Sequence, residues 1–129
     1  MKDMLIKDYM TEMPHSIDPT QSVAQAKEKM IELKCRHLPV LSGRQIVGII
    51  SERDVMAVNS ITSERLKDVP VGEVMLGEVI KVDYTATVNE VVSKMSQNKI
   101  GSVLVTDGSK LKGIFTDTDA ITLLRELTS

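Results

Sequence analysis

The sequence predicts an α+β fold built from two tandem copies of one β-α-β-β-α unit. Shifting the chain of 129 residues by 65 positions superimposes its first half on its second without a gap, and such a fixed period indicates a repeat architecture. In each half, a helix-capping pattern precedes residues with helical apolar spacing. Each half then contains two short apolar runs separated by turn residues, which predict a β-hairpin.

The duplication extends over nearly the whole chain. Identical residues 65 positions apart include Met10 and Met75, Asp18 and Asp83, Thr20 and Thr85, Val23 and Val88, Met30 and Met95, Val40 and Val105, Gly43 and Gly108, Gly48 and Gly113, and Asp54 and Asp119. A chance register would not keep glycine on glycine and apolar on apolar for so long. We therefore expect one module over residues 1–129, with repeats at 6–62 and 71–127 and a connection through Asn59 to Pro70.

The first helix of each unit is predicted to follow a short extended stretch, around His15 to Ile17 in the first unit. Ser22 and Gln25 stand in the capping-box relation S-x-x-Q, and Thr87 and Glu90 repeat it 65 residues later. Apolar residues then follow with helical spacing: Val23, Ala26, Met30 and Leu33 in the first unit, and Val88, Val91, Val92 and Met95 in the second. Each helix should therefore present one apolar face to a core.

A hairpin and a second helix complete each unit. The apolar runs are 38–41 and 46–50 in the first unit and 103–105 and 111–115 in the second. Because Pro39 donates no backbone hydrogen bond, its strand should lie at an edge or turn that position away from its neighbour. The second helices begin near Ser51 and Thr116.

Packing of the two units follows from their size. A unit this small can hardly bury both faces of a sheet alone, so the two units should pack sheet to sheet about a pseudo-twofold axis. That arrangement leaves two related clefts between the repeats. Clefts lined by strand ends and helix N-termini are natural sites for small ligands.

The strand-to-helix junctions at 48–54 and 113–119 both read G-h-h-[ST]-x-x-D, where h is apolar. The glycines, Gly48 and Gly113, let a ligand or another backbone approach closely. The hydroxyl residue stands where a helix begins with free N–H groups, a position that suits phosphate. The aspartate, one turn into the helix, can accept hydrogen bonds from the two neighbouring hydroxyls of a ribose.

Helix capping alone offers a second interpretation of each junction. A Ser or Thr followed three residues later by Asp is a common N-terminal capping pattern that needs no ligand. Taken singly, either junction is better explained by capping. Its recurrence at matching places, each after glycine and an apolar strand, favours a ligand.

The duplicated unit, with its H-L-P-V-like strand at 37–40, a turn and G-h-h-S-x-x-D, resembles the cystathionine-β-synthase (CBS) domain family, whose tandem pairs are called Bateman modules. The likeness runs from about Ile6 to Leu127. It implies a stand-alone regulatory module that binds AMP, ADP, ATP or S-adenosylmethionine in the clefts between paired repeats. By motif position, it implies a ribose role for Asp54 and Asp119, and a position near phosphate for Ser51 and Thr116.

The resemblance also implies weaker assignments. Arg36 and His37 resemble basic residues that the family points at phosphate, and Arg53 lies beside the motif aspartate. The second unit has instead Gly101, Ser102 and Thr118. We therefore expect two unequal sites, the first preferring the more phosphorylated ligand. For Arg36 and His37, a solvated helix end is an equally good explanation.

Apolar strand residues are further candidates for holding an adenine ring. They are Ile17, Val82, Leu38 and Val103. A place in the core explains such residues better.

Composition disfavours several other classes of function. A net charge of −2, a pI near 5.7 and an aromatic content of 2% disfavour nucleic-acid binding. No apolar window approaches the roughly 18 residues of a membrane span. Cys35 is the only cysteine, which excludes an internal disulfide and favours a cytoplasmic protein.

We also expect no catalytic residue, no catalytic cofactor and no metal site. The sequence has no nucleophile-base pairing, no phosphate loop and no H-E-x-x-H motif. His15, His37 and Cys35 lack the spacing of a metal site.

The resemblance implies a homodimer that acts on an unidentified regulated protein. The expected contacts are apolar residues of the second helices, Val55, Met56, Val58, Ile121 and Leu124. The alternative function is a structural or oligomerisation module without a nucleotide ligand.

Overall fold

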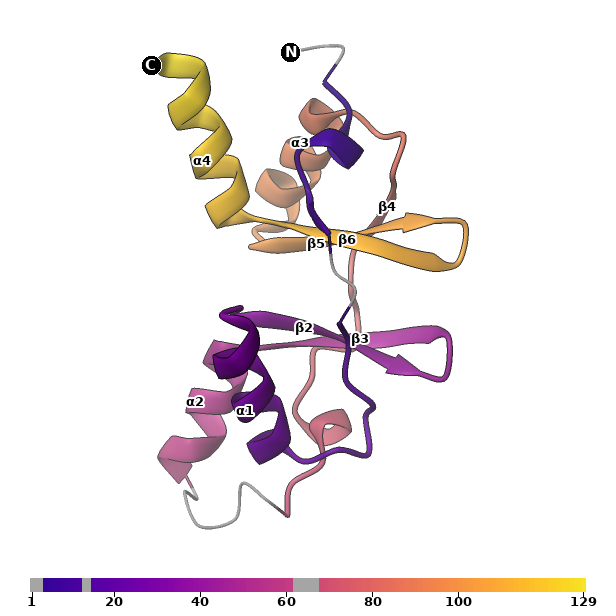
Figure 1. Ribbon diagram of the computed structural model, residues 1–129, viewed down its shortest axis with the longest axis vertical. Helices are drawn as coiled ribbons and strands as arrows, with labels where there is room; N and C mark the ends of the chain where they lie inside the picture. Colours follow the sequence, from indigo (N-terminus) through magenta and orange to yellow (C-terminus); the bar gives the residue numbers. More distant parts are fainter. Residues whose placement is uncertain (1–3, 13–14, 62–67) are drawn as a thin grey trace. The chain divides into compact units, whose positions relative to one another are not determined.

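The computed structural model describes residues 4–12, 15–61 and 68–129, and these form two compact units. The first-repeat unit consists of the described residues of 15–79, and the second-repeat unit combines those of 4–12 with 80–129. Residue 62, where the first repeat was expected to end, lies outside the described residues. Helices and strands occur in both units, which confirms the predicted α+β class (Figure 1).

The helices and hairpin strands follow the predicted order in each repeat, but the extended stretch expected before the first helix forms only a bridge at Ile17 in the first repeat. The first-repeat unit contains α1 (Val23–Leu33), β2 (His37–Ser42), β3 (Gln45–Ser51), α2 (Glu52–Ile61) and the 3₁₀-helix η3 (Val71–Glu73). The second-repeat unit contains the 3₁₀-helix η1 (Ile6–Asp8), β1 (Thr11–Glu12), β4 (Lys81–Asp83), α3 (Val88–Asn98), β5 (Ser102–Asp107), β6 (Lys110–Thr116) and α4 (Asp117–Thr128). Both hairpins turn through glycines with positive φ, 64° at Gly43 and 63° at Gly108, a conformation that costs glycine little.

A hairpin forms the centre of the sheet in each unit. In the second-repeat unit the strand order is β1-β6-β5-β4, with β4 parallel to β5 and the other pairs antiparallel. The first-repeat unit has the antiparallel pair β2-β3. Single bridges occupy the places of its edge strands, since Ile17 pairs in parallel with Val40 and Leu76 pairs antiparallel with Ile49.

Pro39 removes one of the hydrogen bonds that hold β4 in the other unit, where the first-repeat unit has only a bridge. In the second-repeat unit, the equivalent Leu104 donates its N–H to the carbonyl of Ile80 at 3.0 Å. Pro39 cannot make that bond, although its carbonyl accepts from the N–H of Ile17 at 3.0 Å. The position of Pro39 is therefore turned away from β3, as the sequence predicted.

The segment that begins each sequence repeat belongs to the compact unit of the other repeat. In the second-repeat unit, the N–H of Ile6 donates to the carbonyl of Ala86 at 2.8 Å. In the first-repeat unit, the N–H of Val71 donates to the carbonyl of Gln21 at 2.7 Å. Ile6 and Val71 are fully buried in these units. The compact units are thus not the contiguous sequence repeats.

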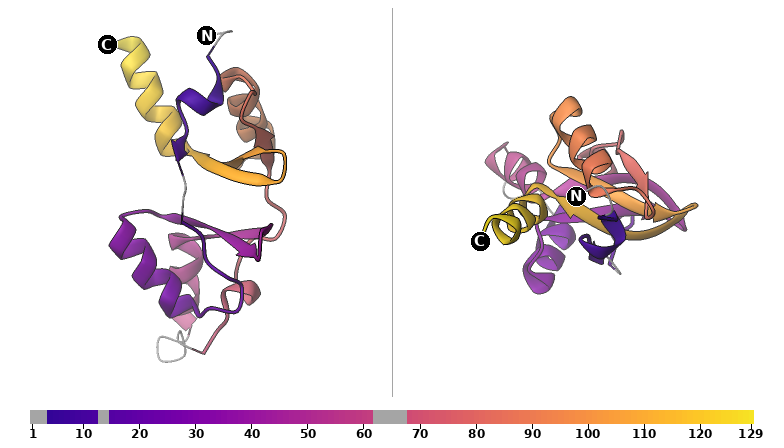
Figure 2. Two further views of the ribbon diagram at one scale, coloured as in Figure 1. Left: turned by 45° about the vertical axis from the view of Figure 1, so that its right-hand side comes forward. Right: turned by 90° about the horizontal axis from the view of Figure 1, so that it is seen from above.

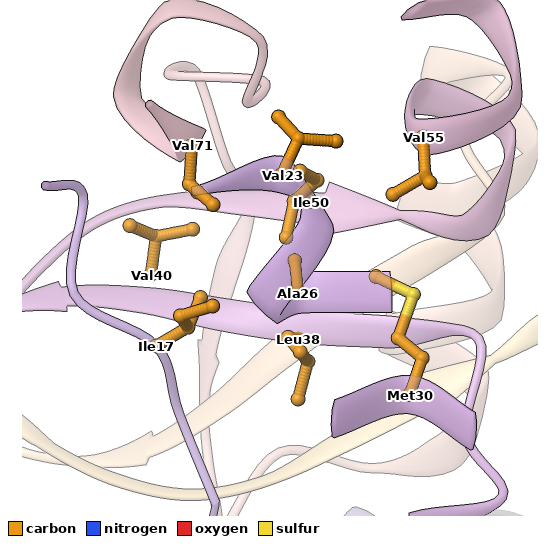
Figure 3. Close-up of a cluster of buried hydrophobic side chains, with 9 residues drawn as sticks. All are labelled: Ile17, Val23, Ala26, Met30, Leu38, Val40, Ile50, Val55 and Val71. Atoms are coloured by element: carbon orange, nitrogen blue, oxygen red, sulfur yellow. The ribbon is translucent and has the colours of Figure 1, made fainter. Parts of the chain in front are cut away.

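Apolar stripes of the first helices form the centre of each core. Figure 3 shows the core of the first-repeat unit, to which α1 contributes Val23, Ala26 and Met30, the hairpin Leu38, Val40 and Ile50, and the remaining segments Ile17, Val55 and Val71 (Figure 3). In α3, Val88, Val91 and Met95 are likewise buried. Val92 is 40% exposed, so its predicted place on the core stripe was wrong: the stripe is narrower than the apolar run.

In the first-repeat unit α2 packs beside α1 on one face of the hairpin, whereas in the second-repeat unit α4 stands apart from α3 (Figure 2). In α2, Val55 is buried and Val58 packs partly against the core. By contrast, Met56, Ile121 and Leu124 are 62%, 67% and 60% exposed. The structure therefore divides the apolar residues of these helices into core residues and surface residues, a division that the sequence left open.

Candidate ligand-binding junctions

The first junction lies where β3 passes into α2. Asp54 Oδ2 accepts hydrogen bonds from the Ser51 N–H at 2.8 Å and the Ser51 hydroxyl at 2.9 Å. The Asp54 N–H donates back to Ser51 Oγ at 3.2 Å. These bonds fix the aspartate side chain over the first turn of α2.

The second junction, between β6 and α4, repeats this geometry. Asp119 Oδ2 accepts from the Thr116 N–H at 2.9 Å and the Thr116 hydroxyl at 3.1 Å. The Asp119 N–H donates to Thr116 Oγ1 at 3.3 Å, which completes a capping box. Asp119 Oδ1 also accepts a hydrogen bond from the hydroxyl of Thr11 at 3.1 Å.

Both motif aspartates therefore cap their own helices, as the interpretation without a ligand requires. Each cap uses only one carboxylate oxygen, however. Among the described residues, no hydrogen bond reaches Oδ1 of Asp54, and this side chain is partly exposed. A carboxylate oxygen has acceptor sites for incoming hydroxyls, so the cap leaves Asp54 able to bind a ligand.

The motif glycines are explained by the approach of another segment of the chain. A Cβ on Gly48 would lie 2.7 Å from the carbonyl oxygen of Leu76, and one on Gly113 would lie 2.5 Å from that of Thr11. The sequence allowed either a ligand or another backbone at these positions, and the structure shows a backbone at both. Their assignment as ligand contacts stays a prediction.

Basic residues gather beside the first junction. His37 pairs with Ser51 across the hairpin, and the carbonyl of Arg36 accepts the N–H of Glu52 at 2.8 Å. Arg36 and Arg53 are exposed. The structure thus places these residues near the start of α2.

The second junction lacks those basic side chains. Gly101 stands in the place of Arg36, and its carbonyl accepts the N–H of Asp117 at 2.9 Å. Ser102 pairs with Thr116 as His37 pairs with Ser51. The two junctions therefore share a backbone arrangement and differ in charge.

The apolar candidates for an adenine contact are core residues of their own units. Ile17 and Val82 are 2% and 7% exposed and belong to the two core clusters. Leu38 and Val103 are buried in the same clusters. No ligand contact needs to be invoked for these side chains.

Thr11 is a junction residue that the sequence reasoning missed. The repeat aligns Met10 with Met75 but places Leu76 where Thr11 stands. The available signal was this departure from the repeat, directly after an identical pair. That difference matters only because Thr11 lies in the second-repeat unit, where its hydroxyl reaches Asp119.

Two further findings concern metals and membranes. Within the described part of the chain, no three His, Cys, Asp or Glu side chains form a group that could hold a metal ion. Among residues 4–12, 15–61 and 68–129, every helix falls short of the length and apolar content that a bilayer-spanning segment needs.

Curated relatives of the chain are longer proteins. It is 30% identical to an uncharacterized 33.4 kDa protein from Thermofilum pendens, over 92% of this chain and 43% of that protein. It is 32% identical to a homoserine O-acetyltransferase from Methanocorpusculum labreanum, over 82% of this chain and 21% of that enzyme. The chain thus spans less than half the length of either relative.

Solved structures match over nearly the full chain. The AcuB protein from Vibrio cholerae has a TM-score of 0.82 and 32% identity, with 97% and 93% of the two chains covered. The CBS domain pair of protein MJ0100 was solved in complex with 5′-methylthioadenosine and S-adenosyl-L-methionine. It has a TM-score of 0.84 and 27% identity, with 95% of this chain and 97% of that chain covered. CBSX2, in complex with AMP, has a TM-score of 0.78 and 25% identity, with 98% of this chain and 99% of that chain covered. The CBS domain family model matches residues 6–60 and 71–126, and the chain belongs to this family as a tandem pair of CBS domains.

Proposed function

We propose that this chain is a regulatory module that binds an adenosine-containing ligand, namely AMP, ADP, ATP or S-adenosylmethionine, at its strand-to-helix junctions. The observation that carries the proposal is Asp54, whose Oδ2 caps α2 while Oδ1 receives no hydrogen bond from the described residues. Support comes from the complexes of MJ0100 and CBSX2, whose ligands all contain adenosine.

The proposed recognition divides the ligand between two kinds of group. The open oxygen of Asp54 accepts hydrogen bonds from ribose hydroxyls, which are stronger for a charged acceptor. Ser51 and the first N–H groups of α2 face the phosphates, because a helix N-terminus favours anions. Arg36 and Arg53 add positive charge there and His37 adds a polar ring, so the first junction should prefer the more phosphorylated ligand.

Regulation fits this chemistry better than catalysis does. CBS domain pairs are regulatory modules that are generally non-catalytic. Ligand binding to one arrangement of the module would shift its population, and a partner protein would detect the shift. The placement of the ligand between the repeats and the identity of the partner stay predictions.

A ligand panel tests the proposal. We expect AMP, ADP, ATP or S-adenosylmethionine to raise the melting temperature and to release or absorb heat in calorimetry, whereas 2′,3′-dideoxy-ATP, which lacks the hydroxyls proposed to meet Asp54, has a smaller effect than ATP. A panel without any melting shift or heat at millimolar adenosine ligand would contradict the proposal.

An Asp54→Asn variant separates ligand binding from capping. The amide oxygen of asparagine can still accept from the Ser51 N–H, so stability should change by no more than about 1 kcal/mol. Loss of the charged acceptor for ribose should weaken binding about ten- to hundredfold. Isothermal calorimetry and thermal melting measure the two effects.

Ser22→Ala is the matched control, because Ser22 caps α1 of the same unit through bonds of 2.9 and 3.1 Å with Gln25. It should cost about 1 kcal/mol of stability without changing ligand affinity. If Asp54→Asn behaves like Ser22→Ala, the aspartate only caps.

A structural or oligomerisation module is the second candidate function. The capping bonds of both aspartates favour it, as does the apolar side of α4, where Ile121, Leu124 and Leu127 are 67%, 60% and 49% exposed at intervals of three residues. Residues three apart on a helix are surface neighbours. We propose that this side pairs with a second copy, and sedimentation of the wild type and an Ile121→Lys variant would show whether the dimer depends on it.

A further inference from the structure

Thr11 makes the two junctions chemically different at the oxygen proposed to hold the ribose. It belongs to β1, which pairs with β6 so that Thr11 lies opposite Ile114. From there its hydroxyl reaches Asp119 Oδ1 at 3.1 Å. Because Oδ2 is already used in the helix cap, both oxygens of Asp119 accept hydrogen bonds.

Leu76 takes the same place in the first-repeat unit without that effect. Leu76 pairs with Ile49 of β3 through two backbone hydrogen bonds of 3.0 and 2.9 Å. This pairing corresponds to that of Thr11 with Ile114 of β6. The Leu76 side chain has no hydroxyl and is 53% exposed. Asp54 Oδ1 therefore receives no hydrogen bond from the described residues.

We propose that Thr11 is a specificity-determining residue that lowers the affinity of the second junction for adenosine by occupying the ribose-facing oxygen of Asp119. The inference rests on the proposed function. A ribose hydroxyl at Asp119 must displace or share the hydrogen bond from Thr11, whereas at Asp54 it meets an open acceptor. The first junction is then the tighter adenosine site, independently of its extra positive charge.

Hydrogen-bond exchange sets the size of the effect. An incoming donor that replaces an existing donor gains only the difference between the two bonds. Removing the competing hydroxyl should therefore recover about the net worth of one hydrogen bond, roughly three- to tenfold in affinity.

The test isolates one junction at a time with AMP and S-adenosylmethionine as probes. In an Asp54→Asn background only the second junction keeps its motif aspartate, and there Thr11→Val should tighten binding about three- to tenfold. Thr11→Ser keeps a hydroxyl and should retain the weaker affinity. In an Asp119→Asn background, Leu76→Thr should weaken the first junction by a similar factor.

The outcomes distinguish this inference from the proposed function. If the wild-type chain and the Thr11→Val chain bind neither probe, both proposals fail. If the wild type binds but Thr11→Val leaves the affinity of the second junction unchanged or lower, or Leu76→Thr leaves the first unchanged, the assignment of Thr11 alone is overturned. Thermal melting of each variant verifies that it is folded.

Discussion

At the scale of single residues, two aspartates, Asp18 and Asp83, are tied by hydrogen bonds to the turns that follow them. Asp18 Oδ1 accepts the Thr20 N–H at 2.8 Å and the Thr20 hydroxyl at 2.6 Å. Asp83 Oδ2 accepts the same two groups of Thr85, with the N–H at 3.0 Å. Hydrogen bonds from the threonine hydroxyls, then from the threonine N–H groups, hold the pKa of both aspartates below the ordinary value.

These carboxylates should therefore make stability depend on acid pH. A pKa that is lower in the folded state means that the charged form stabilises the fold. That contribution is present at neutral pH and disappears as pH falls below the ordinary value, near 4, toward the folded value. Urea unfolding of the wild type between pH 7 and pH about 2.5 should show a steeper acid loss than an Asp18→Asn, Asp83→Asn double variant.

Glu28→Gln, on the exposed side of α1, is the control for that comparison. It should leave the acid slope of the wild type in place. Equal slopes for the wild type and the double variant would mean that the threonine bonds do not favour the charged carboxylates.

Local capping chemistry was predictable from the sequence, but long-range contacts were not. The capping box of Ser22 and Gln25 formed as predicted. At α3, the Thr87 hydroxyl oxygen accepts the Glu90 N–H at 3.1 Å. The second bond of a capping box, from the Thr87 N–H to the Glu90 carboxylate, is not found among the described residues. Thr11 and Asp119 are 108 residues apart, and no local pattern relates them.

At the scale of elements, the junction strands are fixed by the close approach of a neighbouring segment. Gly48 lies against Leu76 and Gly113 against Thr11, at distances too short for a Cβ. Gly48→Ala and Gly113→Ala should therefore displace these segments and cost about 1–3 kcal/mol each, as overpacking does. Chemical denaturation measures the loss.

Gly77→Ala is the matched control, since nothing lies within 4 Å of a Cβ built there. Its effect should stay within about 0.5 kcal/mol. If all three alanine variants are equally stable, the close approach at the junctions does not constrain the fold.

Helices and hairpins were predictable because their signals are local and periodic. The edge strands were less so, because a strand of two or three residues, such as β1 or β4, leaves no periodic pattern. At Pro39, the comparison with Leu104 shows which hydrogen bond is lost. It is the bond that the Leu104 N–H donates to the carbonyl of Ile80, and such a bond would extend the edge strand.

At the scale of the whole molecule, each compact unit is completed by a segment from the other sequence repeat. The repeat could not reveal this exchange. Ile6 and Val71 are equivalent by the 65-residue shift and both apolar, so either could fill either core. Only the three-dimensional pairing, Ile6 with Ala86 and Val71 with Gln21, assigns them.

Removing residues 1–14 should therefore destabilise the second-repeat unit and leave the first-repeat unit intact. The shortened chain loses Ile6 from a core in which it is fully buried, a change worth about 2–5 kcal/mol even for truncation to alanine. Hydrogen exchange should show lost protection in β6 and retained protection in β3. Ile6→Ala in the full chain should give a weaker form of the same pattern. A loss of protection confined to β3 would contradict the assignment of the N-terminal segment to the second-repeat unit.

The central claim is that the two junctions bind adenosine ligands, and amide chemical shifts during titration with AMP or S-adenosylmethionine test it most directly. We predict that the largest shifts fall on residues 51–54 and 116–119, at the starts of α2 and α4, and that the first group saturates at lower ligand concentration. Unchanged amides at both junctions under millimolar ligand, or shifts confined to other surfaces, would contradict the account.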